Sequence, residues 1–228
     1  MKLINICLIV FAVIAAVNAQ FDEKEFQLKR AQNYIFQREY TKANEIYQEL
    51  LEQFPEDHEI AARLITNLIR ISELDKAEQI LEKYKKIFPD LQFVTTSIVL
   101  YTALGDPETA GKIASDYIEK NPGKIAAYRE ISVAFEKVRN YEKSIEVMLK
   151  ARKSARDDYL YTRELALAYE MIEDLSNSSK EYLKHLEYNQ SYFHFVFSRM
   201  KKILAVSPVQ IENIRNYTQN SDNESILE

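Results

Sequence analysis

Small and large apolar residues recur along most of the chain at a spacing of 33 or 34 residues. The clearest series is a row of Ala and Ser positions, each followed in the same segment by large apolar residues. These positions lie 34, 33, 34 and 34 residues apart, at Ala43, Ala77, Ala110, Ser144 and Ser178. A period of this length predicts a stack of similar supersecondary units that share a continuous core.

Two further series keep the same spacing. Twelve residues before each Ala or Ser, the side chain is small or β-branched, at Ala31, Ile65, Ile98, Ser132 and Ala166. Nine residues before it the side chain is large, at Tyr34, Leu68, Tyr101, Phe135 and Tyr169. Each unit is therefore expected to hold two helices, which approach closely at the small side chains while the large ones fill the space between units.

Proline marks the end of three of these units, at Pro55, Pro89 and Pro122. Proline lacks the backbone N–H that a helix interior needs, so it ends a helix and starts a turn. In the last two units Arg156 and Gln190 stand at the corresponding positions.

This combination resembles the tetratricopeptide repeat, a helical hairpin with a period of 34 residues. The resemblance implies an all-α fold: a right-handed superhelix, or α-solenoid, of about five helical hairpins plus a degenerate sixth capping hairpin. The repeat array is expected over residues 20–190, with units near 24–57, 58–90, 91–124, 125–158 and 159–190. The chain has no Trp, and Ile65 and Ile98 replace the usual Gly or Ala, which predicts irregular hairpin angles.

The pattern weakens after residue 190, and residues 191–228 are expected to form the capping hairpin and a polar tail. A helix is predicted from Tyr192 to Leu204, with one apolar face. Ser207 and Pro208 predict the start of the next helix, since Ser is a good cap and Pro suits a first turn. Repeat arrays need such atypical ends to cover their last apolar face.

The first 19 residues are typical of a signal peptide. Lys2 gives a positive start, residues 3–17 are almost wholly apolar, and small residues at Val17 and Ala19 predict cleavage before Gln20. The protein is therefore expected to be exported, either to a periplasm or to the outside of the cell. A retained membrane anchor is the alternative, but the apolar run is shorter than the roughly 20 residues that span a bilayer.

Charge and composition then exclude several function classes. The formal net charge of −5 and the pI of about 5.5 do not favour nucleic acid as a partner. The only cysteine, Cys7, lies in the signal segment, so the exported chain has no thiol for a disulfide, a metal site or catalysis. The three histidines form no metal-binding pair, and His185 is expected to be a structural, packed residue. We expect no catalytic residues, no cofactor and no metal.

The resemblance also implies a groove, because the first helices of stacked hairpins line the concave side of the array. The residues at the inner-face positions are Leu28, Gln32, Ile35, Thr66, Ile69, Thr95, Val99, Thr102, Arg129, Val133, Arg163 and Leu167. A partner protein or peptide segment is expected there, with Arg129 and Arg163 orienting acidic groups.

Two alternatives to an open groove remain. The inner-face residues could pack against the chain's own terminal helices, or Arg and Glu could pair across adjacent first helices. A carboxylate clamp of the kind found in chaperone co-factors is not expected, since Leu28 and Gln32 stand where Lys and Asn would begin it.

The sequence thus predicts a non-catalytic protein-interaction scaffold. The alternative function is a structural module that associates with itself or forms part of a larger protein. Its expected interface is the aromatic-rich segment with Tyr192, Phe193, Phe195 and Phe197, because exposed aromatic clusters mark contact surfaces. A homo-oligomer would then form.

Overall fold

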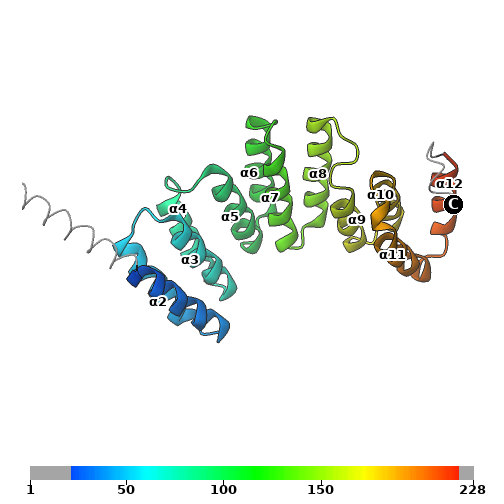
Figure 1. The fold of residues 1–228 in the computed structure, drawn as a ribbon. Helices are drawn as coiled ribbons and strands as arrows, with labels where there is room; N and C mark the ends of the chain where they lie inside the picture. The colour runs from blue at the N-terminus through cyan, green and yellow to red at the C-terminus, as the bar shows by residue number, and fades with distance from the viewer. Residues whose placement is uncertain (1–21, 221–228) are drawn as a thin grey trace, which may run out of the picture. The chain divides into compact units, whose positions relative to one another are not determined.

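The computed structural model describes residues 22–220 (Figure 1). The predicted signal peptide at 1–19 and the end of the predicted polar tail, from residue 221, lie outside the described residues. All regular structure in residues 22–220 is helical, which confirms the predicted all-α class.

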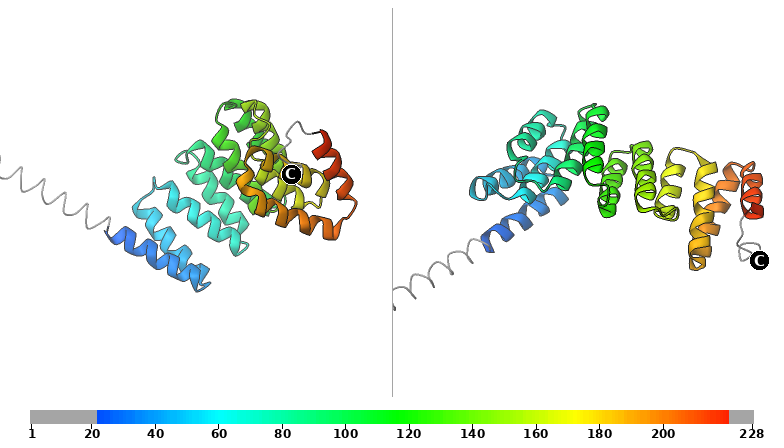
Figure 2. Two further views of the ribbon diagram at one scale, coloured as in Figure 1. Left: turned by 45° about the vertical axis from the view of Figure 1, so that its right-hand side comes forward. Right: turned by 90° about the horizontal axis from the view of Figure 1, so that it is seen from above.

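The helices are connected in sequence by short turns. Residues 22–36 are helical and lead into α2 (Tyr40–Gln53), α3 (His58–Arg70), α4 (Leu74–Tyr84), α5 (Asp90–Ala103), α6 (Pro107–Lys120), α7 (Ile125–Lys137), α8 (Tyr141–Ala155), α9 (Thr162–Met171), α10 (Leu175–Tyr188), the short 3₁₀ helix η1 (Gln190–Tyr192), α11 (Phe193–Val206) and α12 (Gln210–Asn220). Three pairs of consecutive helices form antiparallel hairpins, and the two helices of each pair lie side by side: α3 with α4, α7 with α8, and α9 with α10 (Figures 1 and 2).

The chain divides into two compact units, residues 1–104 and 105–228. The division falls between α5 and α6. Of the described helices, the N-terminal unit comprises the helix at 22–36 with α2 to α5, and the C-terminal unit comprises α6 to α12. Within each unit, stacked hairpins build the core, as in an α-solenoid.

The small or β-branched positions of the repeat are buried in the core. They have no solvent exposure at Ala31, Ala43, Ile65, Ala77, Ile98, Ala110, Ser132, Ser144, Ala166 and Ser178. In the hairpin of α9 and α10, Ser178 Oγ donates a hydrogen bond to the backbone oxygen of Ala166 at 2.9 Å. A side chain can bond a neighbouring helix's backbone only where the two helices touch, so the predicted close approach is confirmed in this hairpin.

Each hairpin turn has a residue in the left-handed region of backbone space. These residues come after the first helix of a repeat and have φ between 59° and 80°, at Arg38, Ser72, Gly105, Arg139 and Glu173. Only Gly105 lacks the Cβ that makes this conformation costly. The left-handed residue reverses the chain so that the second helix can begin within a few residues.

Polar side chains then cap several of the second helices. Asp106 Oδ1 accepts a hydrogen bond from the backbone N–H of Thr109 at the start of α6. Asp174 Oδ1 does the same for the N–H of Asn177 in α10. Such caps satisfy N–H groups that a helix cannot pair internally, and they fix where it begins.

The predicted helix at 192–204 is α11, and its expected apolar face is buried at Val196, Met200 and Ile203. The predicted start of the next helix at Ser207 and Pro208 was wrong, because α12 begins at Gln210. Ser207 instead ends α11, with its N–H bonded to the Ile203 oxygen at 2.8 Å. Because Ser207 ends α11, the chain makes a turn after it before α12 begins.

A buried ion pair joins α8 to α10 in the C-terminal unit. The Arg152 guanidinium donates two hydrogen bonds to the Glu181 carboxylate, at 2.8 and 2.5 Å, and a third to the Leu160 oxygen at 2.7 Å. The two side chains are only 7% and 10% exposed. Water cannot solvate either buried group, so each charge is stabilised by the other.

We predict that Glu181→Gln lowers the free energy of unfolding by about 3–5 kcal/mol, because it strands a buried guanidinium. The matched control is Glu146→Gln, which breaks the exposed pairs of Glu146 with Lys143 and Lys150 and is expected to cost less than about 1 kcal/mol. Urea unfolding monitored by circular dichroism measures both. Equal losses for the two variants would contradict this account of the buried pair.

Candidate functional site

A cavity of about 220 Å³ opens in the N-terminal unit, and we call it the α2–α3 cavity. It is lined by Gln32 and Ile35 from the helix at 22–36, by Tyr47 from α2, and by Ala62, Arg63, Thr66, Asn67 and Arg70 from α3. Three of the predicted groove residues, Gln32, Ile35 and Thr66, therefore meet in one cavity.

The α2–α3 cavity contains polar atoms that lack partners within the described residues. Tyr47 is fully buried, and its Oη makes no hydrogen bond of standard geometry among the described residues, although it lies close enough to the Arg63 guanidinium to interact with it. Burial raises the pKa of the Tyr47 hydroxyl, and the nearby charges of Arg63 and Arg70 partly offset this rise. Buried hydroxyls normally have a partner, so a donor of this kind beside a cavity marks a place where a ligand can bind.

Asn67 is the second buried polar residue of the cavity. Its Nδ2 donates to the Tyr40 backbone oxygen at 2.9 Å and to Asn44 Oδ1 at 2.6 Å. These two bonds fix the orientation of the amide, and they leave Asn67 Oδ1 buried without a donor among residues 22–220. The cavity thus offers one fixed acceptor as well as donors.

Arg63 and Arg70 supply the positive charge of the cavity. Both are exposed residues seven positions apart on α3, which places them two turns apart on one face of the helix. Neither is paired with a carboxylate within the part of the chain that the structure describes. The predicted groove residues included none of these three. Arg63 and Tyr47 do not stand at the inner-face positions that the resemblance implied, and Arg70 stands at one that was not singled out.

The other predicted groove residues of the N-terminal unit do not line the α2–α3 cavity. Leu28 and Ile69 are partly buried and pack against the hydrophobic core. On α5, Thr95, Val99 and Thr102 are half-buried. These predicted groove residues are thus partly accessible, and Leu28, Ile69 and Val99 are apolar.

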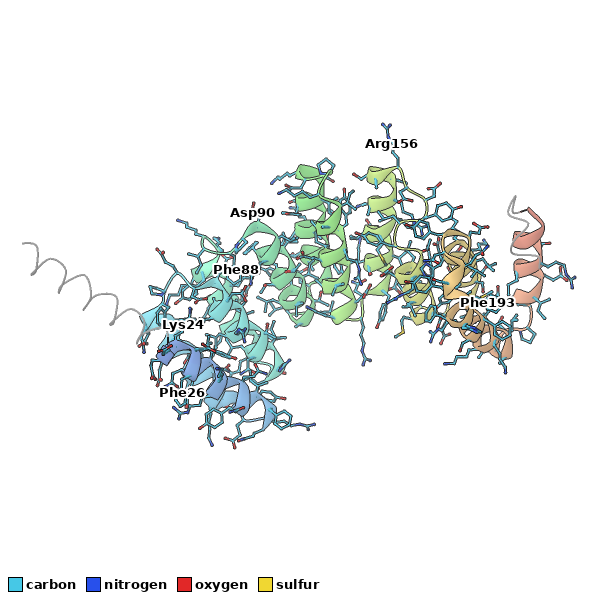
Figure 3. The ribbon with its side chains drawn as sticks, in the orientation of Figure 1. Lys24, Phe26, Phe88, Asp90, Arg156 and Phe193 are labelled. Carbon is cyan, nitrogen blue, oxygen red and sulfur yellow. The ribbon has the colours of Figure 1, made fainter. Side chains whose placement is uncertain are left out.

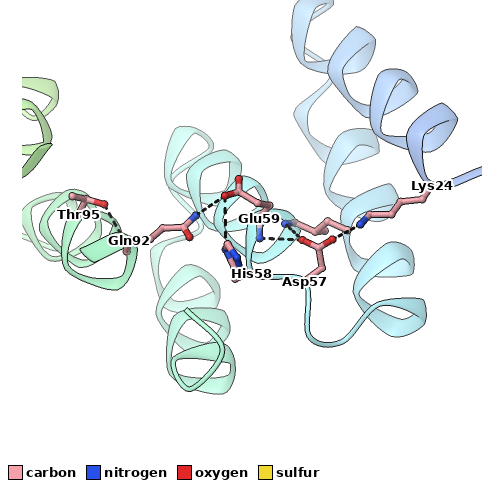
Figure 4. Close-up of polar contacts among 7 residues, drawn as sticks. Lys24, Asp57, His58, Glu59, Gln92 and Thr95 are labelled. Carbon is pink, nitrogen blue, oxygen red and sulfur yellow. Dashed lines mark hydrogen bonds and ion pairs between the residues drawn. The ribbon is translucent and has the colours of Figure 1, made fainter. Parts of the chain in front are cut away.

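Polar contacts tie these first helices together along one edge (Figure 4). Lys24 pairs with Asp57, which also caps α3 through the N–H groups of Glu59 and Ile60. Glu59 in turn accepts from Gln92 Nε2 of α5 at 3.3 Å. The edge is held by side chains of neighbouring repeats, which positions α3 and its arginines.

The C-terminal unit uses its inner-face charges differently. Arg129 of α7 lies 3.8 Å from Glu164 of α9, and Glu170 of α9 pairs with Arg199 of α11. The alternative that Arg and Glu pair across adjacent first helices therefore applies to Arg129. Arg163 stays exposed, while Val133 and Leu167 are half-buried.

The aromatic-rich segment is divided between surface and core. Phe193 and Phe197 are 51% and 59% exposed and stack with ring centroids 5.8 Å apart (Phe193 is labelled in Figure 3). Phe195 is instead partly buried with its ring 5.9 Å from that of Tyr182, and Tyr192 lies over His185. Helical spacing explains the division, because residues four apart share a face and a residue two apart does not.

The exposed phenylalanines border a second cavity, of about 520 Å³, which we call the α10–α12 cavity. Its lining is Leu183 and Leu186 of α10, Phe193, Val196, Phe197, Met200, Lys201 and Leu204 of α11, and Ile214 of α12. Lys201 is the only charged residue of this lining. The sequence could not predict this cavity, because it depends on how three helices pack.

Two further classes of site were sought over residues 22–220. This part of the chain brings together no group of three His, Asp or Glu side chains suited to a metal ion. None of its helices combines the length and the apolar character needed to cross a membrane.

Comparison with known proteins identifies the repeat. Residues 36–93 match the family model of the tetratricopeptide repeat. Curated proteins gave no match. Among solved structures, a thermophilic tetratricopeptide protein of Thermus thermophilus is similar at 16% identity and a TM-score of 0.49, covering 80% of this chain and 99% of that one. MamA of Desulfovibrio magneticus RS-1 is similar at 17% identity and a TM-score of 0.45, covering 75% and 97%.

His185 is the buried histidine of the C-terminal unit. Its Nδ1 lies 2.9 Å from Thr162 Oγ1, and its ring centroid lies 4.4 Å from that of Tyr192. Burial lowers the pKa of His185 below its ordinary value of 6.5, while Glu164 opposes and Arg163 reinforces this shift. The folded protein therefore holds the neutral imidazole.

We predict that His185 makes the protein less stable as the pH falls below about 6.5, since the unfolded chain then binds a proton that the folded state excludes. His185→Gln is expected to remove this part of the dependence. Urea unfolding of both proteins at about pH 7 and about pH 5.5 measures the difference. Parallel curves for the two proteins would show that His185 does not contribute.

Proposed function

Because residues 36–93 match the family model of the tetratricopeptide repeat, we propose that the protein is a non-catalytic scaffold that binds a segment of a partner protein on its N-terminal unit. The observation that carries this proposal is the α2–α3 cavity. It joins the predicted groove residues Gln32, Ile35 and Thr66 to two unpaired arginines on one helix face. Such a mixture of apolar wall and convergent polar groups is typical of ligand sites.

The arginines of the two units differ in their partners, and this difference supports a binding site on the N-terminal unit. In the C-terminal unit, Arg129 has a carboxylate neighbour in Glu164, so its charge is already matched. In the N-terminal unit, Arg63 and Arg70 keep their charge for another molecule. The proposed place of action is a periplasm or the outside of the cell, on the basis of the apolar segment at 3–17.

We predict that a photoreactive amino acid at Thr66 or at Val99 forms a covalent adduct with one defined partner protein in the cells that make this protein. Thr66 lines the α2–α3 cavity, and Val99 lies on the next first helix, α5. Mass spectrometry of the adduct identifies the partner and the crosslinked peptide.

The matched control is the same photoreactive group at Lys83, an exposed position on α4, which is the second helix of its hairpin. It is expected to give no adduct with that partner. Adducts from Thr66 and Val99 that map only to this chain would overturn the proposal, since its own helices would then occupy the groove.

A second candidate function is self-association through the α10–α12 cavity. Phe193 and Phe197 are exposed and stacked, and the cavity beside them is almost wholly apolar. Exposed apolar surface of this kind costs free energy in water and favours association. The occupant we propose is the same surface of a second copy, in a symmetric dimer.

We predict that sedimentation equilibrium of the purified protein detects a dimer, and that Phe197→Ser weakens its association about tenfold or more by removing buried aromatic area. Phe36→Ser is the control, because Phe36 is 89% exposed but belongs to the N-terminal unit. A monomer at all concentrations, or equal weakening by both variants, would exclude this candidate.

A further inference from the structure

We propose that the α2–α3 cavity binds the carboxylate of an acidic side chain, Asp or Glu, carried by an extended segment of the partner. This inference rests on the proposed scaffold function and names the chemistry that the scaffold recognises. It depends on the residues of the cavity and not on the carboxylate clamp, whose positions Leu28 and Gln32 do not match.

The charge of the cavity supports an anion. The chain has 35 acidic residues against 30 basic ones, yet the lining of the cavity contains no Asp or Glu and two arginines. Those arginines have no carboxylate partner in residues 22–220, unlike Arg129, Arg152 and Arg199 of the C-terminal unit. A guanidinium presents several N–H donors in a plane and binds carboxylates through paired hydrogen bonds.

The donors reach the cavity from two helices. Arg63 and Arg70 lie on α3, with about 10.5 Å of helix between them, and their long side chains can converge on one ligand. Tyr47 comes from α2, and its buried hydroxyl interacts with the Arg63 guanidinium but makes no hydrogen bond of standard geometry among the described residues. A carboxylate accepts hydrogen bonds at both oxygens, so one group can satisfy the tyrosine and an arginine together.

A buried acceptor on Asn67, one of the residues that line the cavity, favours a peptide over a free acid. Asn67 Oδ1 is a buried acceptor whose orientation is fixed by the two bonds that Asn67 Nδ2 donates. A carboxylate cannot donate to it, but the backbone N–H of a peptide can. The half-buried Ile35 and Ala62 supply an apolar wall for the methylene groups of the same acidic residue.

The proposal is tested by nuclear magnetic resonance titration of the purified protein. The probe is N-acetyl-glutamate N-methylamide, and the matched probe is N-acetyl-glutamine N-methylamide, which has the same shape without the charge. The observed signals are the side-chain Nε–H resonances of Arg63 and Arg70, assigned with Arg63→Gln and Arg70→Gln.

The expected result is a saturable shift of both arginine signals with the glutamate probe and no saturable shift with the glutamine probe. Acetate is expected to bind at least several-fold more weakly than the glutamate probe, because it cannot use Asn67. Equal binding of acetate would overturn the peptide as the source of the carboxylate. Tighter binding of inorganic phosphate than of the glutamate probe would overturn the carboxylate itself.

Tyr47→Phe is the decisive variant, because it removes one oxygen that makes no hydrogen bond of standard geometry among residues 22–220 of the unliganded protein. It is expected to leave folding intact and to weaken the glutamate probe about tenfold, as loss of a hydrogen bond to a charged group does. The control Lys86→Gln removes one exposed charge from the same unit and is expected to change binding by less than about twofold, since it lies outside the cavity lining. Unchanged binding in Tyr47→Phe would overturn the proposed site.

Failure of this inference can be told apart from failure of the scaffold function. A defined partner adduct at Thr66, together with no binding of the glutamate probe, leaves the scaffold standing and overturns the carboxylate site. Binding of the glutamate probe without any partner adduct at Thr66 or Val99 overturns the scaffold function. The carboxylate would then not come from a partner protein.

Discussion

The close approach of two helices at small side chains is the constraint on which the rest of this structure depends. Ala43, Ala77 and Ser178 have no solvent exposure, and at Ser178 the approach is near enough for a side chain to bond the facing backbone. Helices held at that distance have no room for large residues at the crossing, so the large residues lie toward the neighbouring repeat. Tyr47 is one of them. It is fully buried in the core of the N-terminal unit, and it is also one of the residues that line the α2–α3 cavity.

Much of this could be predicted because it depends on local spacing. A period of 34 residues fixes which positions face the core of each hairpin, and the burial of Ala31 or Ala166 is a consequence of that period alone.

The cavity could be predicted only in part. Gln32 and Thr66 stand at positions that line grooves in the family, whereas Tyr47 reads from sequence as an ordinary packing residue. Whether its hydroxyl finds a partner depends on side chains from other helices, which no repeat pattern specifies. The start of α12 was missed for a local reason, since Ser207 suits either end of a helix.

The two units satisfy their charges by different means. In the C-terminal unit, arginines meet carboxylates from neighbouring repeats, and the pair of Arg152 and Glu181 is sealed from solvent. In the N-terminal unit the contacts between first helices run along one edge, from Lys24 to Gln92, and Arg63 and Arg70 are left out of them (Figure 4). One unit therefore uses its electrostatic interactions for cohesion, and the other leaves two arginines without a carboxylate among the described residues, as the proposed recognition of an acidic segment requires. The same repeat, with similar small positions, supports both uses because charged residues occupy sites that the packing leaves free.

The left-handed turn residues have a consequence for how such an array melts. Arg38, Ser72, Arg139 and Glu173 each hold a conformation that costs an L-residue roughly 1 kcal/mol relative to glycine. In a one-dimensional array, a cost placed inside one hairpin lowers the intrinsic stability of that hairpin and leaves its interfaces with the neighbouring hairpins unchanged. Each of these hairpins therefore depends more on its neighbours for folding than a hairpin without that cost. Gly105 avoids the Cβ clash of the left-handed conformation, but glycine loses more backbone entropy on folding than other residues do, so its hairpin too relies on the packing of adjacent helices.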